Sequence, residues 1–271
     1  MSVNFQTKES YGMEDLLAIM RLLRGEGGCP WDREQTHQSI RKNFIEETYE
    51  VCEAIDLEDQ ELLREELGDV LLQVVFHSQM EQEAGHFGFA EVCDGICKKL
   101  IQRHPHVFGQ VQVEGSGQVL ENWEAIKQQS KGQTTQTEAV RSVPKTLPAL
   151  MRAQKVQKRA SKSGFCYPDV YWAMDDLESE LDELQEAMDQ QDKAACQEEL
   201  GDVLFAAANV ARFLGVDAEE SLTGSTEKFI ARFARVEEMA RQRGIDMAQA
   251  EISVLEDLWE EAKAWDGARE K

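Results

Sequence analysis

Two sets of four acidic residues have a spacing that suits a metal site. Each set is an ExxE motif followed, sixteen residues further on, by an ExxD motif. The sets are Glu47, Glu50, Glu66 and Asp69, and Glu180, Glu183, Glu199 and Asp202. Because residues three apart lie on one face of a helix, about one turn apart, each motif supplies two carboxylates on the same face.

The spacing within each set is symmetric. The first set is centred on Glu58 and the second on Gln191, so that the outer acids of a set are equidistant from its centre, and so are the inner ones. We therefore expect each set to lie on an antiparallel helical hairpin with its turn near the central residue. Such a hairpin brings all four acids to matching heights on facing helices.

Four carboxylates gathered in this way repel one another, so either some of them take up protons or a cation binds among them. All-oxygen ligands suit a hard ion such as Mg²⁺ or Mn²⁺. The alternative is a solvated acidic face in an acid-rich protein, but a symmetric spacing that occurs twice favours the metal site. A ferritin-like di-iron site would need ExxH motifs, and the candidate from Glu83 to His86 contains Gly85 at an expected helix end.

Cations and aromatic residues also recur at matching places. Each half has a Lys–Arg pair four residues apart, which could direct two cations at one anion, and a tryptophan followed four residues later by a lysine. The residues are Lys99, Arg103, Trp123 and Lys127, and Lys228, Arg232, Trp259 and Lys263. With the acids they fit a metal-bridged nucleoside polyphosphate whose base stacks on the aromatic ring. Taken singly, the basic pairs suit an exposed surface and the tryptophans suit core packing.

Asn209 follows Asp202 by seven residues and so lies on the same helix face. It either hydrogen-bonds a base or sugar or is a satisfied buried amide. The chain has no GxxxxGK[ST] loop, which excludes a P-loop nucleotide site.

The composition narrows the function class. Acidic residues outnumber basic ones by 52 to 29, for a net charge of −23, which argues against a general nucleic-acid binder. The N-terminal stretch lacks the features of a signal peptide, and no apolar run is long enough to span a bilayer. Six cysteines are scattered without a CxxC pair, as expected for reduced thiols. We expect a cytoplasmic protein without nucleic-acid or membrane partners.

The elements that position these residues are predicted to be helices. Apolar residues recur with a 3.6-residue period, for example from Leu67 to Val75, and the few prolines lie at boundaries. The polar stretch 130–148, closed by two prolines, is typical of a linker. We expect it to separate an N-terminal domain, residues 1–129, from a C-terminal domain, residues 149–271, both all-α helical bundles.

The two halves are related by duplication. A shift of 133 residues superposes EELGDVL, residues 65–71, on an identical stretch at residues 198–204. Each copy contains a glycine, which costs about 1 kcal/mol relative to alanine inside a helix. We expect that something approaches the backbone closely beside the acids, either a neighbouring helix or the nucleotide.

Four stretches together resemble the MazG nucleoside triphosphate pyrophosphohydrolases. They are CPWDREQTHQSI (29–40), FIEETYEV (44–51), EELGDVLLQVVFH (65–77) and RHPHVFG (103–109). The resemblance covers nearly the whole chain and is specific to the tandem two-domain form. It implies the all-alpha NTP pyrophosphatase fold, a homodimer, and Mg²⁺-dependent conversion of NTPs to NMP and pyrophosphate with broad base tolerance.

In that family the C-terminal domain is held to carry the activity. The resemblance then implies that the second acid set binds metal and acts in catalysis. In our hypothesis of metal-assisted hydrolysis, Glu180 or Glu183 serves as general base. It also implies that Lys228, Arg232, Trp259 and Lys263 engage the nucleotide. One departure is that Ser179 stands where the first half has Glu46. By spacing alone the N-terminal set is equally complete, and its phosphate-binding candidates occupy corresponding places.

Three points stay open at this level. A metal-activated water could attack the α or the β phosphorus, since both give the same products. The enzyme could instead be a narrow house-cleaning pyrophosphatase for one damaged or deoxy nucleotide. A nucleotide-sensing regulatory protein without turnover is the alternative from outside the enzymes.

Overall fold

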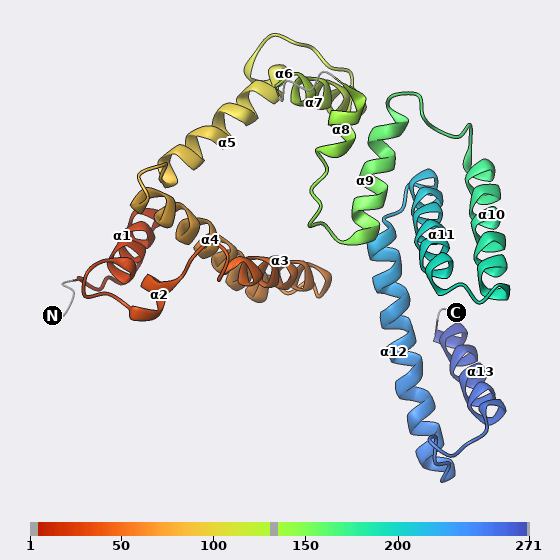
Figure 1. Ribbon diagram of the computed structural model, residues 1–271. Coiled ribbons are helices and arrows are strands. Elements are labelled where there is room, and N and C mark those ends of the chain that lie inside the picture. The colour runs from red at the N-terminus through yellow and green to blue at the C-terminus, as the bar shows by residue number, and fades with distance from the viewer. Residues whose placement is uncertain (1–4, 131–134, 270–271) are drawn as a thin grey trace. The chain divides into compact units, whose positions relative to one another are not determined.

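The computed structural model describes residues 5–130 and 135–269, which form thirteen helices and no strand (Figure 1). The predicted all-α fold is confirmed. The chain divides into two compact units, residues 1–127 and 128–271. None of the helices in the described ranges is long and apolar enough to cross a membrane.

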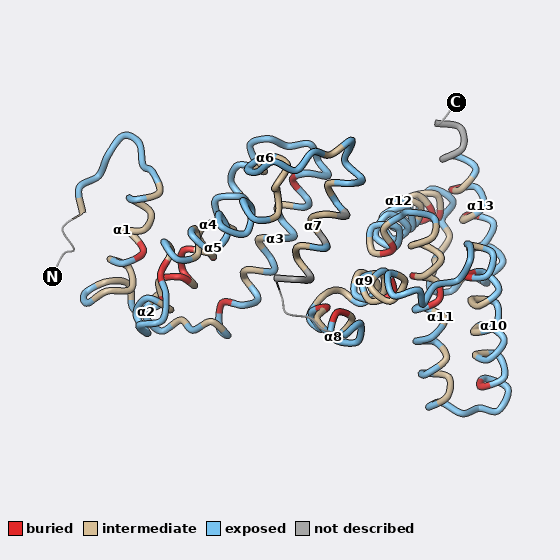
Figure 2. Tube along the Cα trace, turned by 90° about the horizontal axis from the view of Figure 1, so that it is seen from above, coloured by how far each residue is buried: buried red, intermediate tan, exposed pale blue. Residues whose placement is uncertain are grey.

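The first unit is built around a long hairpin. Its helices are α1 (Met13–Arg24), α2 (Pro30–Glu34), α3 (Arg41–Asp56), α4 (Gln60–Glu83), α5 (Phe89–Arg103), α6 (Pro105–Phe108) and most of α7 (Ser116–Ser130). Helices α3 and α4 run antiparallel, and α1 packs against α4 (Figure 1). The core of this unit, which appears in red in Figure 2, consists of Met20, Ile40, Val75, Phe76 and Met80.

The second unit repeats the hairpin and adds a second helix pair. Its helices are α8 (Gln136–Arg141), α9 (Ala149–Ser161), α10 (Val170–Asp189), α11 (Lys193–Leu214), α12 (Ala218–Arg243) and α13 (Ile252–Arg269). Small buried residues, Ala173 and Ala187 on α10 and Ala206 and Ala208 on α11, lie within this hairpin and the helices around it. Helix α9 packs on α11, while α12 and α13 pair through a separate apolar cluster that includes Val236 and Leu258.

Both hairpins turn at the centres of symmetry of the acid sets. Glu58 and Gln191 have φ values of +53° and +55°, the left-handed backbone that reverses the chain after each first helix. The next residue is an aspartate in each case. Asp59 and Asp192 accept hydrogen bonds from the first-turn amides of α4 and α11 at 2.9–3.1 Å, so each second helix begins directly after the turn.

The stretch 130–148, predicted to be a linker, contains a short helix. Residues 131–134 lie outside the described residues, but α8 follows them and packs on α9. Thr135 and Glu138 form a capping box at its start, and Ala139 and Val143 are buried. Arg159 of α9 donates a hydrogen bond to the carbonyl of Ala139. This segment therefore belongs to the second unit.

Candidate active site

Each hairpin gathers three of its four predicted acids into one cluster. In each cluster the nearest carboxylate oxygens lie within 4.8 Å of one another, close enough to share a cation. The clusters are Glu47, Glu66 and Asp69 of α3–α4, and Glu180, Glu199 and Asp202 of α10–α11. The donor set is all oxygen, which fits a hard divalent ion such as Mg²⁺ or Mn²⁺.

The second cluster holds charge that nothing within it neutralises. Burial, followed by the charges of Glu183 and Asp202, raises the pKa of Glu180, and burial with the same two charges raises the pKa of Glu199. The first cluster behaves in the same way: burial, then a hydrogen bond with Glu50, raises the pKa of Glu47. These shifts are those expected of carboxylates placed together to receive a cation.

The fourth acid of each set lies beside its cluster of three. Glu50 interacts with Glu47, and the charge of Glu183 acts on both Glu180 and Glu199. Ser179, which replaces the leading glutamate of the first half, donates a hydrogen bond to Glu183 at 3.4 Å. The departure noted in the sequence thus supplies a donor to Glu183 in place of another negative charge.

The cations and tryptophans are arranged differently in the two units. In the first, the guanidinium of Arg103 and the ammonium of Lys127 lie 5.0 and 4.8 Å from the ring centroid of Trp123. Lys99 is exposed on the same helix as Arg103.

In the second unit the predicted nucleotide-binding residues lie on α12 and α13, whereas the acids lie on α10 and α11. Trp259 packs against Phe229, with ring centroids 5.2 Å apart, at the edge of the α12–α13 cluster. Lys228 is exposed, Arg232 is half-buried, and Lys263 forms an ion pair with Glu260. That these side chains bind a nucleotide stays a prediction.

The glycines beside the acids have no close neighbour in the described chain. A methyl group on Gly68 or Gly201 would meet no atom within 4 Å outside its own helix. Of the two expectations for this position, a neighbouring helix in the same chain is therefore wrong. Approach by a nucleotide stays a prediction.

A cavity of about 440 Å³ in the second unit is lined by residues of α9, α10, α11 and the loop after α9, and it was not foreseen from the sequence. Its polar lining consists of Gln157 of α9, Tyr167 of the following loop, Asp176 of α10, and Asn209 and Arg212 of α11. The hydroxyl of Tyr167 donates to Asp176 at 2.7 Å, and this bond, then burial, then the charges of Asp176 and Glu180 raise the pKa of Tyr167. The charge of the acid cluster therefore acts on a residue that lines the cavity.

Comparison with known protein families finds the same duplication. The model of the MazG nucleotide pyrophosphohydrolase domain matches the chain twice, at residues 35–108 and 173–236, and each match contains one acid set. The chain belongs to the MazG family. The resemblance of the four sequence stretches is thereby confirmed, and the protein is an enzyme of the nucleotide pyrophosphohydrolase class.

Relatives extend the match over nearly the whole chain. The nucleoside triphosphate pyrophosphohydrolase of Escherichia coli K12 is 45% identical over 93% of this chain and 97% of its own length. A protein of Thermotoga maritima named nucleoside triphosphate pyrophosphohydrolase/pyrophosphatase MazG is 42% identical over 93% and 96%. YabN of Bacillus subtilis, which is uncharacterized, is 45% identical over 91% of this chain but 50% of YabN.

Proposed function

We propose that this enzyme hydrolyses nucleoside triphosphates to the monophosphate and pyrophosphate, with Mg²⁺ or Mn²⁺ and with broad tolerance of the base. The observation that carries the proposal is the cluster of Glu180, Glu199 and Asp202, whose ligand oxygens lie within 4.8 Å of one another. The duplicated hairpin gathers Glu47, Glu66 and Asp69 in the same way. The printed names of the Escherichia coli and Thermotoga maritima relatives support the substrate class.

The second unit is the proposed site of hydrolysis. Glu180, Glu199 and Asp202 would hold the metal, and the chemistry that Mg²⁺ supplies when bound is polarisation of the phosphates and acidification of water. Glu183 lies outside that group of three and accepts a hydrogen bond from Ser179, so it is our candidate general base. Its proposed role is to accept the proton of the attacking water.

The cations of α12 and α13 are the proposed partners of the triphosphate. Lys228 and Arg232 lie four residues apart on one face of α12, and Arg offers planar, bidentate contacts to phosphate oxygens. Such contacts would stabilise the charge that develops on the pyrophosphate leaving group. Trp259 and Lys263 of α13 would complete this side of the site.

A homodimer is also proposed. Leu200 and Leu204 of α11, and Phe229 and Phe233 of α12, are between 45 and 54% exposed although they are large and apolar. A second copy of the chain would cover such residues. Light scattering coupled to size exclusion is expected to give twice the chain mass of 30.7 kDa; a monomer would contradict this part of the proposal.

The activity is tested by product analysis. Release of pyrophosphate and monophosphate from each of the common NTPs and dNTPs is expected with Mg²⁺ and is expected to stop with EDTA. Rates within about tenfold of one another across the bases would support broad tolerance. Turnover of only one damaged or deoxy nucleotide would contradict the broad base tolerance. Release of orthophosphate instead of pyrophosphate would contradict the proposed reaction.

A further inference from the structure

The cavity of the second unit contains a buried hydrogen-bond acceptor that lacks a donor. Gln157 is 8% exposed, and its side-chain Nε2 donates to the backbone carbonyl of Phe205 at 2.8 Å. That bond fixes which end of the amide is nitrogen. The other end, Oε1, is buried and has no hydrogen-bond partner among the described residues. Because buried acceptors are almost always paired, this oxygen is open to a donor supplied from outside the chain.

A second amide lines the same cavity in a fixed orientation. The Oδ1 of Asn209 accepts a hydrogen bond from the Nε of Arg212 at 3.0 Å, which leaves its amino group as the donor of this side chain. Arg212 is itself held in place by a long contact of 3.5 Å with the sulfur of Cys166. Beside Asp176 and Arg212, the cavity therefore offers an amide oxygen without a donor, on Gln157, and an amide amino group, on Asn209.

Flat aromatic surfaces complete the lining. Phe165 and Tyr167 come from the loop after α9, and Phe205 comes from α11. Phe165 is 84% exposed, an unusual state for a phenylalanine, and the described residues leave most of its ring uncovered. Aromatic faces with a donor and an acceptor at the edge are the features that bind a nucleobase, which stacks by its face and hydrogen-bonds by its edge.

The distance from the cavity to the acids suits a nucleotide. Asp176 lines the cavity and lies one helical turn before Glu180 on α10. On α11, Asn209 follows Asp202 by seven residues, a rise of about 10 Å. A nucleotide whose base lies in the cavity could thus extend its phosphates toward the acids.

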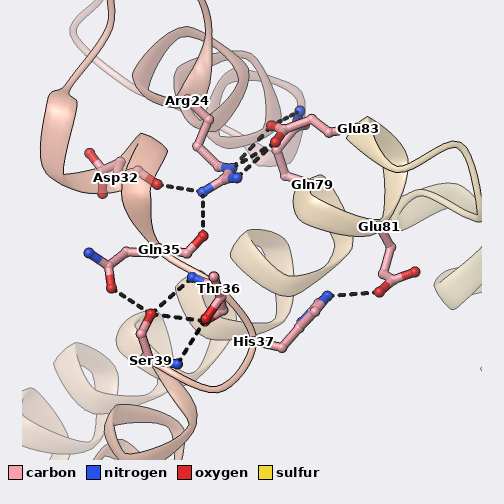
Figure 3. Close-up of polar contacts among 9 residues, drawn as sticks. All are labelled: Arg24, Asp32, Gln35, Thr36, His37, Ser39, Gln79, Glu81 and Glu83. Carbon is pink, nitrogen blue, oxygen red and sulfur yellow. Dashed lines mark hydrogen bonds and ion pairs between the residues drawn. The ribbon is translucent and has the colours of Figure 1, made fainter.

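In the first unit the corresponding place is filled. The 133-residue shift that aligns the acid sets places Phe76 at the position of Asn209, and Phe76 is 5% exposed in the core. The guanidinium of Arg24 lies 5.2 Å from the Phe76 ring centroid and is held by Glu83 at 2.8 Å and by backbone carbonyls (Figure 3). The duplicated units therefore share the acids and differ at this position.

We propose that the cavity of the second unit is the nucleobase site, and that Gln157 is a base-binding residue whose Oε1 accepts an N–H from the edge of the base. Each of the common bases carries such a donor, which is consistent with broad tolerance. The inference rests on the proposed function, because it places the base of the same nucleotide whose phosphates lie at the acids.

The test measures binding, so that it does not depend on turnover. Affinities of the full-length protein with Mg²⁺ are measured by calorimetry for α,β-methylene-ATP, for the same analogue of purine riboside triphosphate, which has no edge N–H, and for ribose 5-triphosphate, which has no base. Gln157→Leu is expected to lower the affinity for the ATP analogue about tenfold, which is the effect of losing one buried hydrogen bond. The affinities for the other two ligands are expected to stay unchanged. Gln73→Leu is the matched control, since Gln73 of the first unit is also 8% exposed with an unpaired Oε1.

Equal affinity of Gln157→Leu and the wild type for the ATP analogue would overturn the inference, and so would an equal loss for all three ligands. If Gln157→Leu does not fold, as judged by its circular dichroism melt, the Asn209→Phe variant tests the base site instead. It introduces the side chain of the first unit, and it is expected to abolish the preference for the ATP analogue over ribose 5-triphosphate; a retained preference would overturn the proposal. Absence of pyrophosphate release by the wild type would refute the proposed function, while the binding series would still decide the base site.

Discussion

Replacing Gly201 by alanine separates stability from function at the acid cluster. Gly201 lies inside α11 between Glu199 and Asp202, and a methyl group there meets no atom within 4 Å outside the helix. Glycine costs about 1 kcal/mol relative to alanine inside a helix, so Gly201→Ala is expected to raise the free energy of unfolding by about that amount. For a unit of this size the melting temperature rises by about 3–5 °C.

The same substitution is expected to lower turnover, because we expect the nucleotide to approach the backbone beside the acids. Gly68→Ala in the first unit is the matched variant: its surroundings are equally open, so it should stabilise its own unit similarly while leaving turnover unchanged. Unfolding in urea, followed by circular dichroism, measures the first effect, and pyrophosphate release measures the second. A Gly201→Ala variant that is less stable than the wild type would refute the packing argument, and one that is more stable and fully active would refute the functional reason for the glycine.

Three further predictions concern the hairpins and the first unit. Gln191→Gly is expected to stabilise the second unit by about 0.5–1 kcal/mol, because φ is +55° there, whereas Gln190→Gly, with φ of −78°, should give no gain in the same urea titration. The pKa of Glu180 is raised above its ordinary 4.5, so its contribution to stability is present below pH 4.5 and is lost as the pH rises through the folded-state pKa. In EDTA, the gain in melting temperature from Glu180→Gln should therefore be larger at pH 7 than at pH 4.5; a gain independent of pH would contradict the assigned cause. Arg24→Leu should lower the free energy of unfolding of the first unit by about 2 kcal/mol, because it removes charged hydrogen bonds to Glu83. An unchanged urea midpoint would contradict that contribution.

The hairpins could be predicted from the sequence because local rules suffice for them. The 3.6-residue period gives the helices, and the symmetric spacing of the acids gives the register of one helix on the next. The turns at Glu58 and Gln191 follow from that register, and the aspartate after each is a common helix-capping residue.

The cavity could not be predicted in this way. Gln157 lies in a helix of mixed polar and apolar residues, and its unpaired oxygen arises only because its amide nitrogen reaches the carbonyl of Phe205, 48 residues away. No rule of residue spacing predicts that contact. Helix α8 is a different case, since the T-x-x-E motif of Thr135 and Glu138 was available as a helix-start signal within the polar stretch.

The choice between the two acid clusters is the central functional claim. It rests on the resemblance to the family and on the contrast between the open cavity near Asn209 and the filled position of Phe76. Both clusters have carboxylates within the reach of one cation, so metal binding alone does not distinguish them.

Pyrophosphate release from ATP with Mg²⁺, measured for Glu199→Gln and Glu66→Gln side by side, tests this claim most directly. The two glutamates occupy equivalent positions in the duplicated EELGDVL stretches, so each variant is the matched control of the other. We expect Glu199→Gln to lower kcat by at least about a hundredfold, in line with the loss of a group that acts on transition-state charge or proton transfer, and Glu66→Gln to retain wild-type turnover. Loss of activity in Glu66→Gln alone would reverse the assignment of the two units, and full activity in both variants would contradict the carboxylate-cluster mechanism.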